Sequence, residues 1–239
     1  MGIYTISDLH LSFSADKPMD VFGGKWENYT EKLKRNWNDI VTDKDIVVLP
    51  GDLSWATYLE DSMLDFSFIH SLNGRKIIMK GNHDYWFSTA AKINAFFEKN
   101  GLASLCLLHN NFYIFCDESG KRYGICGTKG FDVSKNPTKG SDLKLLNRES
   151  MRLAYSVTQA EKAGCDENLV FLHYPPVFTN GKFNRNPFTE VMQQHGIKKC
   201  FYGHLHNTAA QRAVNGEYEG IEYKLVSCDH LNFVPYRIL

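Results

Sequence analysis

Five short apolar runs in this chain are each followed at once by residues that bind metal ions, and this repeated pattern restricts the possible folds most strongly. The motifs are Ser7-Asp8-Leu9-His10, Gly51-Asp52, Gly81-Asn82-His83-Asp84, His173 with a following Tyr-Pro-Pro, and Gly203-His204-Leu205-His206. A short apolar run bounded by glycine or polar residues is typical of a buried strand. The sequence therefore predicts that the polar motifs lie where strands end.

The order of the expected elements indicates a mixed α/β fold. Strands are expected at 3–6, 45–49, 76–79, 104–108, 111–116, 121–126, 168–172, 199–202, 208–212, 221–227 and 232–239. Helices are expected at 28–40, 60–72, 88–100, 143–163 and 190–195. Strands alternate with helices early, whereas the middle and the end read as hairpins and antiparallel strands. This pattern predicts two sheets with helices outside them, and the lack of a linker favours one domain over residues 1–239.

Charge and cysteine content narrow the class of protein further. The chain has 27 Lys and Arg residues against 27 Asp and Glu residues, a balance that argues against a protein dominated by nucleic-acid backbone contacts. Its six cysteines form no CxxC pair, which favours free thiols and a reducing, cytoplasmic location. We see no leader peptide and no apolar stretch long enough for a membrane-spanning helix, so no membrane partner is expected.

The spacing within the motifs favours a shared metal site. In an open α/β sheet, ligands bind beyond the carboxyl ends of the strands, so several strand ends can surround one point. Asp8 and His10 lie two residues apart, which in extended backbone turns both side chains the same way, and His204 and His206 repeat this spacing. Imidazole and carboxylate together suit Zn, Fe and Mn.

Together the five motifs resemble those of the calcineurin-like metallophosphoesterase superfamily, whose pattern is DxH, GD, GNHD or GNHE, an isolated His, and GHxH. The resemblance extends from residue 3 to about residue 210. It implies a four-layer α/β/β/α sandwich of two mixed sheets flanked by helices. It also implies two divalent metal ions, Mn, Fe, Zn or Ni. The implied ligands are Asp8, His10 and His206 for one ion, Asn82, His173 and His204 for the other, and Asp52 as the bridge.

The same resemblance implies a metal-dependent phosphoesterase in which hydroxide shared by the two ions attacks phosphorus. His83 would hydrogen-bond the phosphate or protonate the leaving oxygen, and Asp84 would orient its imidazole. We expect a small-molecule phosphomonoester or phosphodiester as substrate, with the diester preferred. The alternatives are a nuclease of the same superfamily and a non-catalytic scaffold that keeps the fold. The oligomeric state stays open.

Several further residues have open roles. Trp55 could line the pocket or pack in the core, and Lys129 could meet an anion or stay in solvent. Asp229 and His230 follow an expected strand and could approach the site. The polar loops at 16–26 and 131–142 are the expected determinants of substrate choice.

Overall fold

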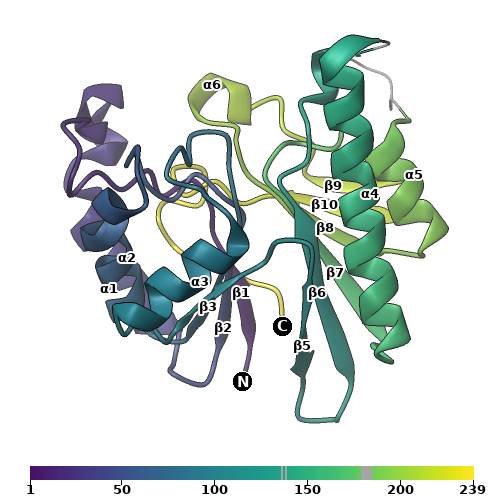
Figure 1. The fold of residues 1–239 in the computed structure, drawn as a ribbon, viewed down its shortest axis with the longest axis horizontal. Coiled ribbons are helices and arrows are strands. Elements are labelled where there is room, and N and C mark those ends of the chain that lie inside the picture. Colours follow the sequence, from purple (N-terminus) through teal and green to yellow (C-terminus); the bar gives the residue numbers. More distant parts are fainter. Residues whose placement is uncertain (136, 138, 179–184) are drawn as a thin grey trace. The chain divides into compact units, whose positions relative to one another are not determined.

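The computed structural model describes residues 1–135, 137, 139–178 and 185–239. These residues form two compact units, each with one sheet. Unit 1 comprises Met1–Leu107 and Val226–Leu239, and unit 2 comprises Leu108–Leu225 (Figure 1). Unit 2 is thus inserted into the chain of unit 1. The single domain expected over residues 1–239 stays a prediction.

Unit 1 contains a five-stranded sheet with the order β11-β1-β2-β3-β4. Its strands are β1 (Ile3–Thr5), β2 (Ile46–Leu49), β3 (Arg75–Ile78), β4 (Leu105–Leu107) and β11 (Tyr236–Arg237). The first four run parallel, and β11 pairs antiparallel with β1 at the edge. Strand β2 reads Ile-Val-Val-Leu, and its last three side chains are buried. Such uninterrupted apolar runs are characteristic of parallel strands that are covered on both faces.

Three helices cover one face of this sheet (Figure 1). They are α1 (Tyr29–Ile40), α2 (Met63–Ser71) and α3 (Ala90–Lys99), with 3-10 turns η1 (Met19–Phe22), η2 (Gly24–Trp26) and η3 (Glu60–Ser62) beside them. Trp37 of α1, Phe66 of α2 and Phe97 of α3 are buried in one cluster with Val47 and Leu49 of β2. Burying an apolar side chain of this size contributes about 1.5–3 kcal/mol.

Unit 2 contains a six-stranded sheet with the order β5-β6-β7-β8-β10-β9. Its strands are β5 (Phe112–Cys116), β6 (Arg122–Thr128), β7 (Glu167–Leu172), β8 (Lys199–Tyr202), β9 (Gly216–Tyr218) and β10 (Ile221–Leu225). Strands β6, β7, β8 and β10 are parallel, and the two edge strands are antiparallel. The helical segments are η4 (Val133–Lys135), α4 (Gly140–Lys162), α5 (Pro187–Gln194) and α6 (Asn207–Ala210). Leu153 and Val157 of α4 are buried in one cluster with Val170 of β7.

Three expectations about elements are wrong. Strand β4 was expected in the middle hairpins, but it pairs in parallel with β3, because helix α3 connects the two strands as a crossover. Residues 208–212 were expected as a strand, yet Asn207–Ala210 form α6, in agreement with the helix propensity of its two alanines. Of residues 232–239, Tyr236–Arg237 alone form a strand within the described chain.

The expected α/β class, with two mixed sheets flanked by helices, is confirmed. All six cysteines are free, as predicted, although Cys116 is exposed rather than buried. Burial raises the pKa of the Cys126 thiol to about 12, so this thiol is unreactive near neutral pH. Among the described residues, no helix is both long and apolar enough to cross a membrane.

Candidate metal centre

In unit 1, the loops after β1 and β2 run side by side and bring three predicted ligands together. The amide of Asp8 donates to the carbonyl of Gly51 at 3.0 Å, and the amide of His10 donates to the carbonyl of Asp52 at 3.0 Å. His10 Nε2 lies 3.9 Å from Asp52 Oδ2. Asp8 and His10 each offer a ligand atom within 4.8 Å of the other. The loop backbones are thus hydrogen-bonded in the register that gathers these side chains.

The backbone at these positions is strained. Asp8, His10 and Asp52 have φ values of 60°, 46° and 53°, in the left-handed region that non-glycine residues seldom adopt. In unit 2, the predicted ligand His204 has a φ of 75°. Strained backbone of this kind costs about 1–3 kcal/mol per residue and clusters at functional sites, where the surrounding structure holds it in place. The strain coincides with residues that were singled out for their chemistry alone.

Two glycines let the loops after β2 and β3 approach each other closely. A Cβ atom at Gly81 would lie 2.0 Å from Asp52 Oδ1, and one at Gly51 would lie 2.5 Å from the amide nitrogen of Gly81. Both glycines are therefore required by contact, and Gly51 also has a φ of 89°. This explains why each Gly precedes a predicted ligand.

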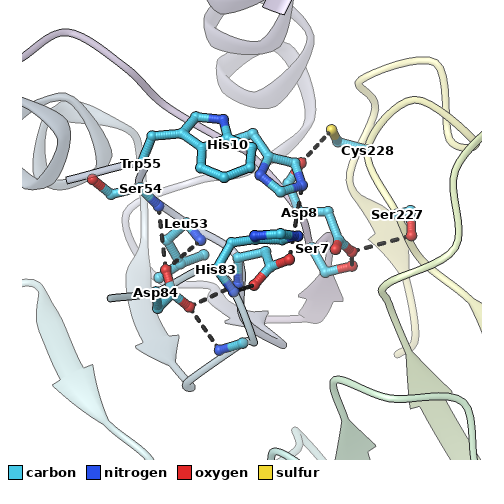
Figure 2. Close-up of polar contacts among 12 residues, drawn as sticks. Ser7, Asp8, His10, Leu53, Ser54, Trp55, His83, Asp84, Ser227 and Cys228 are labelled. Atoms are coloured by element: carbon cyan, nitrogen blue, oxygen red, sulfur yellow. Dashed lines mark hydrogen bonds and ion pairs between the residues drawn. The ribbon is translucent and has the colours of Figure 1, made fainter. Parts of the chain in front are cut away.

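The carboxylate of Asp84 is a hydrogen-bond acceptor for both of these loops (Figure 2). It accepts from the amides of Asp52 at 2.8 Å, Leu53 at 2.8 Å and Gly81 at 2.6 Å. The amide of Ser54 and the indole N–H of Trp86 add bonds of 3.3 and 2.9 Å. Asp84 is thus bonded mainly to backbone, and its expected role toward the imidazole of His83 stays a prediction.

Asp8 is held by Ser7 of its own motif and by two residues that the sequence analysis did not single out, Ser227 and Cys228. The hydroxyls of Ser7 and Ser227 both donate to Asp8 Oδ2, the latter at 3.1 Å, and the Cys228 thiol donates to the Asp8 carbonyl at 2.9 Å (Figure 2). Ser7 forms a parallel bridge with Ser227. The strand expected at 221–227 could have indicated Ser227, which lies at its end. The sequence analysis named Asp229 and His230, which follow it, instead.

An aromatic side chain covers His10 and His83. The Trp55 ring stacks on His10 at 4.9 Å with an interplanar angle of 23°, and it is tilted against His83 at 4.7 Å (Figure 2). The Lys17 ammonium lies 4.4 Å from the Trp55 ring centroid, and the indole N–H points at the Met19 sulfur at 3.2 Å. Trp55 therefore belongs to the site, and it anchors the 16–26 loop there.

The Gly-Asn-His-Asp segment completes the unit 1 part of the site. The amide of His83 donates to Asp52 Oδ1 at 2.8 Å, and the His83 and His10 rings lie 5.7 Å apart. Asn82 lies between Gly81 and His83 in this loop and is half-buried. The carboxylate of Asp52, the predicted bridging ligand, thus accepts a hydrogen bond from the backbone of His83, the predicted acid.

In unit 2, the remaining predicted ligands lie just after two neighbouring strands. His173 follows β7 and is fully buried, whereas His204 and His206 follow β8 and are half-buried. The His173 and His204 rings are 5.2 Å apart, and each offers a ligand atom within 4.8 Å of the other. The ring of Tyr174 lies 4.6 Å from that of His204. Unit 2 thus supplies clustered imidazoles at its strand ends.

The other open residues have modest roles in the structure. The ammonium of Lys129 lies 5.8 Å from the Tyr174 ring centroid. The backbone carbonyl of Lys129 accepts a hydrogen bond from the amide of His173 at 3.2 Å. The carbonyl of Asp229 accepts from Lys25 Nζ at 3.5 Å. His230 is half-buried. In the 131–142 loop, positions 136 and 138 lie outside the described residues.

Comparison with known protein sequences gives one broad match to a family and one partial match to a relative. The sequence profile of the calcineurin-like phosphoesterases matches residues 1–208. An uncharacterized protein, MJ1445, from Methanocaldococcus jannaschii is 32% identical over 87 residues, which are 34% of this chain and 46% of that protein. The matched segment thus spans about half the length of that relative.

Similar chains are found among solved structures. TT1561 of Thermus thermophilus has a TM-score of 0.55 at 12% identity, covering 85% of this chain and 81% of its own. A protein of unknown function, AQ665 from Aquifex aeolicus, has a TM-score of 0.48 at 15% identity, covering 99% and 95% of the two chains. At such identities, the Thermus structure supports the fold alone.

Proposed function

Because the chain belongs to the calcineurin-like phosphoesterase family, we propose that it is a metal-dependent hydrolase of small-molecule phosphate esters. The observation that carries this proposal is the gathering of Asp8, His10 and Asp52, each with left-handed backbone, at neighbouring strand ends. The surrounding structure must hold such backbone in place. The presence of the proposed acid His83 beside these ligands supports a hydrolase over a non-catalytic scaffold.

The donor set fits a pair of divalent metal ions. Unit 1 offers the carboxylates of Asp8 and Asp52, the imidazole of His10 and the amide of Asn82, and unit 2 offers three imidazoles. We propose that both sets serve the same two ions, drawn from Mn, Fe, Zn and Ni, with Asp52 as the shared ligand. Bound ions would supply Lewis-acid stabilisation of the phosphoryl oxygens and a water of lowered pKa.

The residues of the chain itself have separable tasks. His83 would donate a proton to the leaving oxygen, a contribution of about 10²–10⁴-fold in rate. Trp55, stacked on His10 and tilted against His83, would fix the two rings and exclude water from them. Asp84 would hold the loops that carry Asp52 and His83.

We propose a small phosphodiester or phosphomonoester as substrate, and a cytoplasmic location, which the six free thiols support. The balanced charge of the chain makes a nuclease the second choice.

Substitutions in each unit test the shared metal pair. We expect Asp52→Asn in unit 1 and His204→Ala in unit 2 each to lose bound metal in elemental analysis and most of the Mn-supported hydrolysis of p-nitrophenyl phosphate. His195→Ala is the matched control, since His195 Nδ1 lies 2.9 Å from Glu161 Oε1 and the residue belongs to neither ligand set. Full metal content and activity in either ligand variant would contradict the proposal.

The proposed acid requires a different signature. We expect His83→Ala to keep both metals while its turnover of glycerol 2-phosphate, whose alkoxide leaving group needs a proton, falls by about 10²–10⁴-fold. Comparing p-nitrophenyl phosphate with bis-p-nitrophenyl phosphate in the wild type decides between monoesterase and diesterase activity. A His83→Ala enzyme with wild-type turnover would remove His83 from the reaction.

A further inference from the structure

A wide groove opens in unit 1 beside the loop that carries His83. It has a volume of about 760 Å³, within the usual range for small-molecule sites. Its walls come from three segments: the loop and turn at 57–63, the loop at 85–88 that follows Asp84, and one face of α3. None of the predicted metal ligands lines it. The groove therefore lies beside the loop that carries the proposed acid His83, and it is separate from the predicted metal ligands.

Aromatic rings at the groove are exposed in an unusual way for such large side chains. Tyr58 and Tyr85 are 68% and 58% exposed, yet both line the groove. The buried Trp86 also lines the groove, with its indole N–H bonded to Asp84. Exposed aromatic rings such as Tyr58 and Tyr85 are suited to stacking against a flat ligand.

The groove also carries a positive charge. Lys92 and Lys99 lie on the groove face of α3, seven residues apart and hence about 10.5 Å along the helix. Glu60 brings one negative charge from the opposite segment, so two positive charges stand against one negative. Ammonium groups on flexible stems bind phosphate as point charges. The lining thus combines ring-stacking surfaces with sites for an anion.

The groove connects to the proposed acid through Tyr85. Its ring meets the His83 ring edge to face, with centroids 6.1 Å apart and an interplanar angle of 82°. If His83 protonates the leaving oxygen, the leaving group departs on the side of His83. Tyr85 places the groove on that side.

We propose that the groove binds the leaving group of the substrate, and that this group is a nucleotide. The nucleobase stacks on Tyr58 and Tyr85, and a second phosphate of the substrate binds Lys92 or Lys99. This assignment rests on the proposed phosphohydrolase function for the direction of departure, whereas the binding itself can be measured without turnover.

Isothermal titration calorimetry of ADP with the metal-free protein tests the assignment. We expect Tyr58→Ala to weaken ADP binding by at least about fivefold, the lower range for loss of one base-stacking contact. The double variant Lys92→Gln/Lys99→Gln should weaken ADP binding as well, because it removes both ammonium groups that could bind the phosphate. Adenosine and inorganic pyrophosphate should each bind more weakly than ADP, since each lacks one half of the contacts. Tyr155→Ala and Lys34→Gln are matched controls on exposed positions outside the groove, and should bind ADP as the wild type does.

Each result has a definite reading. An absence of ADP binding by the wild type, or equal binding by the groove variants, would overturn the assignment. So would binding of pyrophosphate as tight as that of ADP, because the rings would then contribute nothing. A wild type that binds ADP in the groove but hydrolyses no ester when loaded with Mn would contradict the proposed function and the leaving-group role, and would leave nucleotide binding by the groove standing.

Discussion

At the scale of single residues, the candidate centre depends on side chains that support the ligands. Asp84 accepts hydrogen bonds from the amides of Asp52 and Gly81, and thereby joins the loops after β2 and β3. Ser227 donates to the carboxylate of Asp8 from a distant part of the chain. Such supporting contacts commonly change metal affinity or activity by about 10–100-fold.

Replacement of Asp84 by Asn should destabilise the protein. The amide side chain keeps one acceptor oxygen but turns N–H groups toward backbone donors, which leaves buried amides without an acceptor. We expect the free energy of unfolding to fall by about 2–3 kcal/mol. Urea denaturation measures this, with the exposed Asp39→Asn of α1 as a control expected to stay within about 0.5 kcal/mol of the wild type. An Asp84→Asn protein as stable as that control would contradict the role of the carboxylate.

Loss of the Ser227 hydroxyl should weaken metal binding while sparing the fold. We expect Ser227→Ala to raise the dissociation constant for Mn by about tenfold, because the Asp8 carboxylate loses one of the groups that orient it. The measurement is a competitive titration against a fluorescent chelator. Ser71→Ala, which removes a bond confined to α2, is the matched control. Equal affinities in the two variants would show that Ser227 does not orient Asp8.

At the scale of elements, Asp45 ties the starts of β1 and β2 together. Its carboxylate accepts from the Gly2 amide at 2.6 Å, and from the amide and hydroxyl of Thr42, each at 2.7 Å. Burial alone would raise the pKa of Asp45, but these hydrogen bonds outweigh it and hold the pKa below its ordinary value.

This lowered pKa predicts how stability depends on pH. Because the folded protein holds the ionised form more strongly, the contribution is complete above the unfolded pKa of about 3.9 and is lost as the pH falls through the lower folded pKa. We expect Asp45→Asn to be less stable than the wild type at pH 7, and the difference to shrink below about pH 4. Denaturation at pH 7, 4 and 3 checks this, and a difference that stays constant across the series would refute it.

Elements that formed as expected are those with strong local signals, and the failures share a physical cause. The run Ile46–Leu49 has no polar residue, so its identity as a buried strand needs no tertiary information. The sequence predicts strand β4 but not its pairing with β3, because that parallel pairing depends on the crossover through α3. The segment Asn207–Ala210 is four residues long and shows no helical repeat of apolar residues, so its helix cannot be recognised from the sequence pattern.

The candidate site was predictable for the residues that carry chemistry and not for those that support them. Asp8 and His10 were found from residue type and spacing. Ser227 is an ordinary serine 219 residues away from Asp8 in the chain, and its hydrogen bond exists through the fold alone. The left-handed backbone of Asp52 likewise has no signal beyond the glycine before it.

At the scale of the whole molecule, metal loading should control stability if both units supply ligands to the same ions. Saturation with Mn at about 100 times the dissociation constant should stabilise the protein by about 2.7 kcal/mol per ion, seen as a rise in Tm that EDTA reverses. Asp8→Asn and His204→Ala should each reduce the shift, with His195→Ala as control. A shift that survives in both ligand variants would place the stabilising ions elsewhere.

The return of residues 226–239 to the first sheet has a consequence for synthesis of the protein. The nascent chain delivers Asp8 first, but its partner Ser227 is made only after the whole of unit 2. Unit 2 is continuous in sequence and can fold while translation proceeds, since chains generally fold from the N-terminal side as they emerge. The carboxylate of Asp8 therefore lacks its Ser227 partner until unit 2 has been synthesised, so the surroundings of Asp8 are expected to form only after that point.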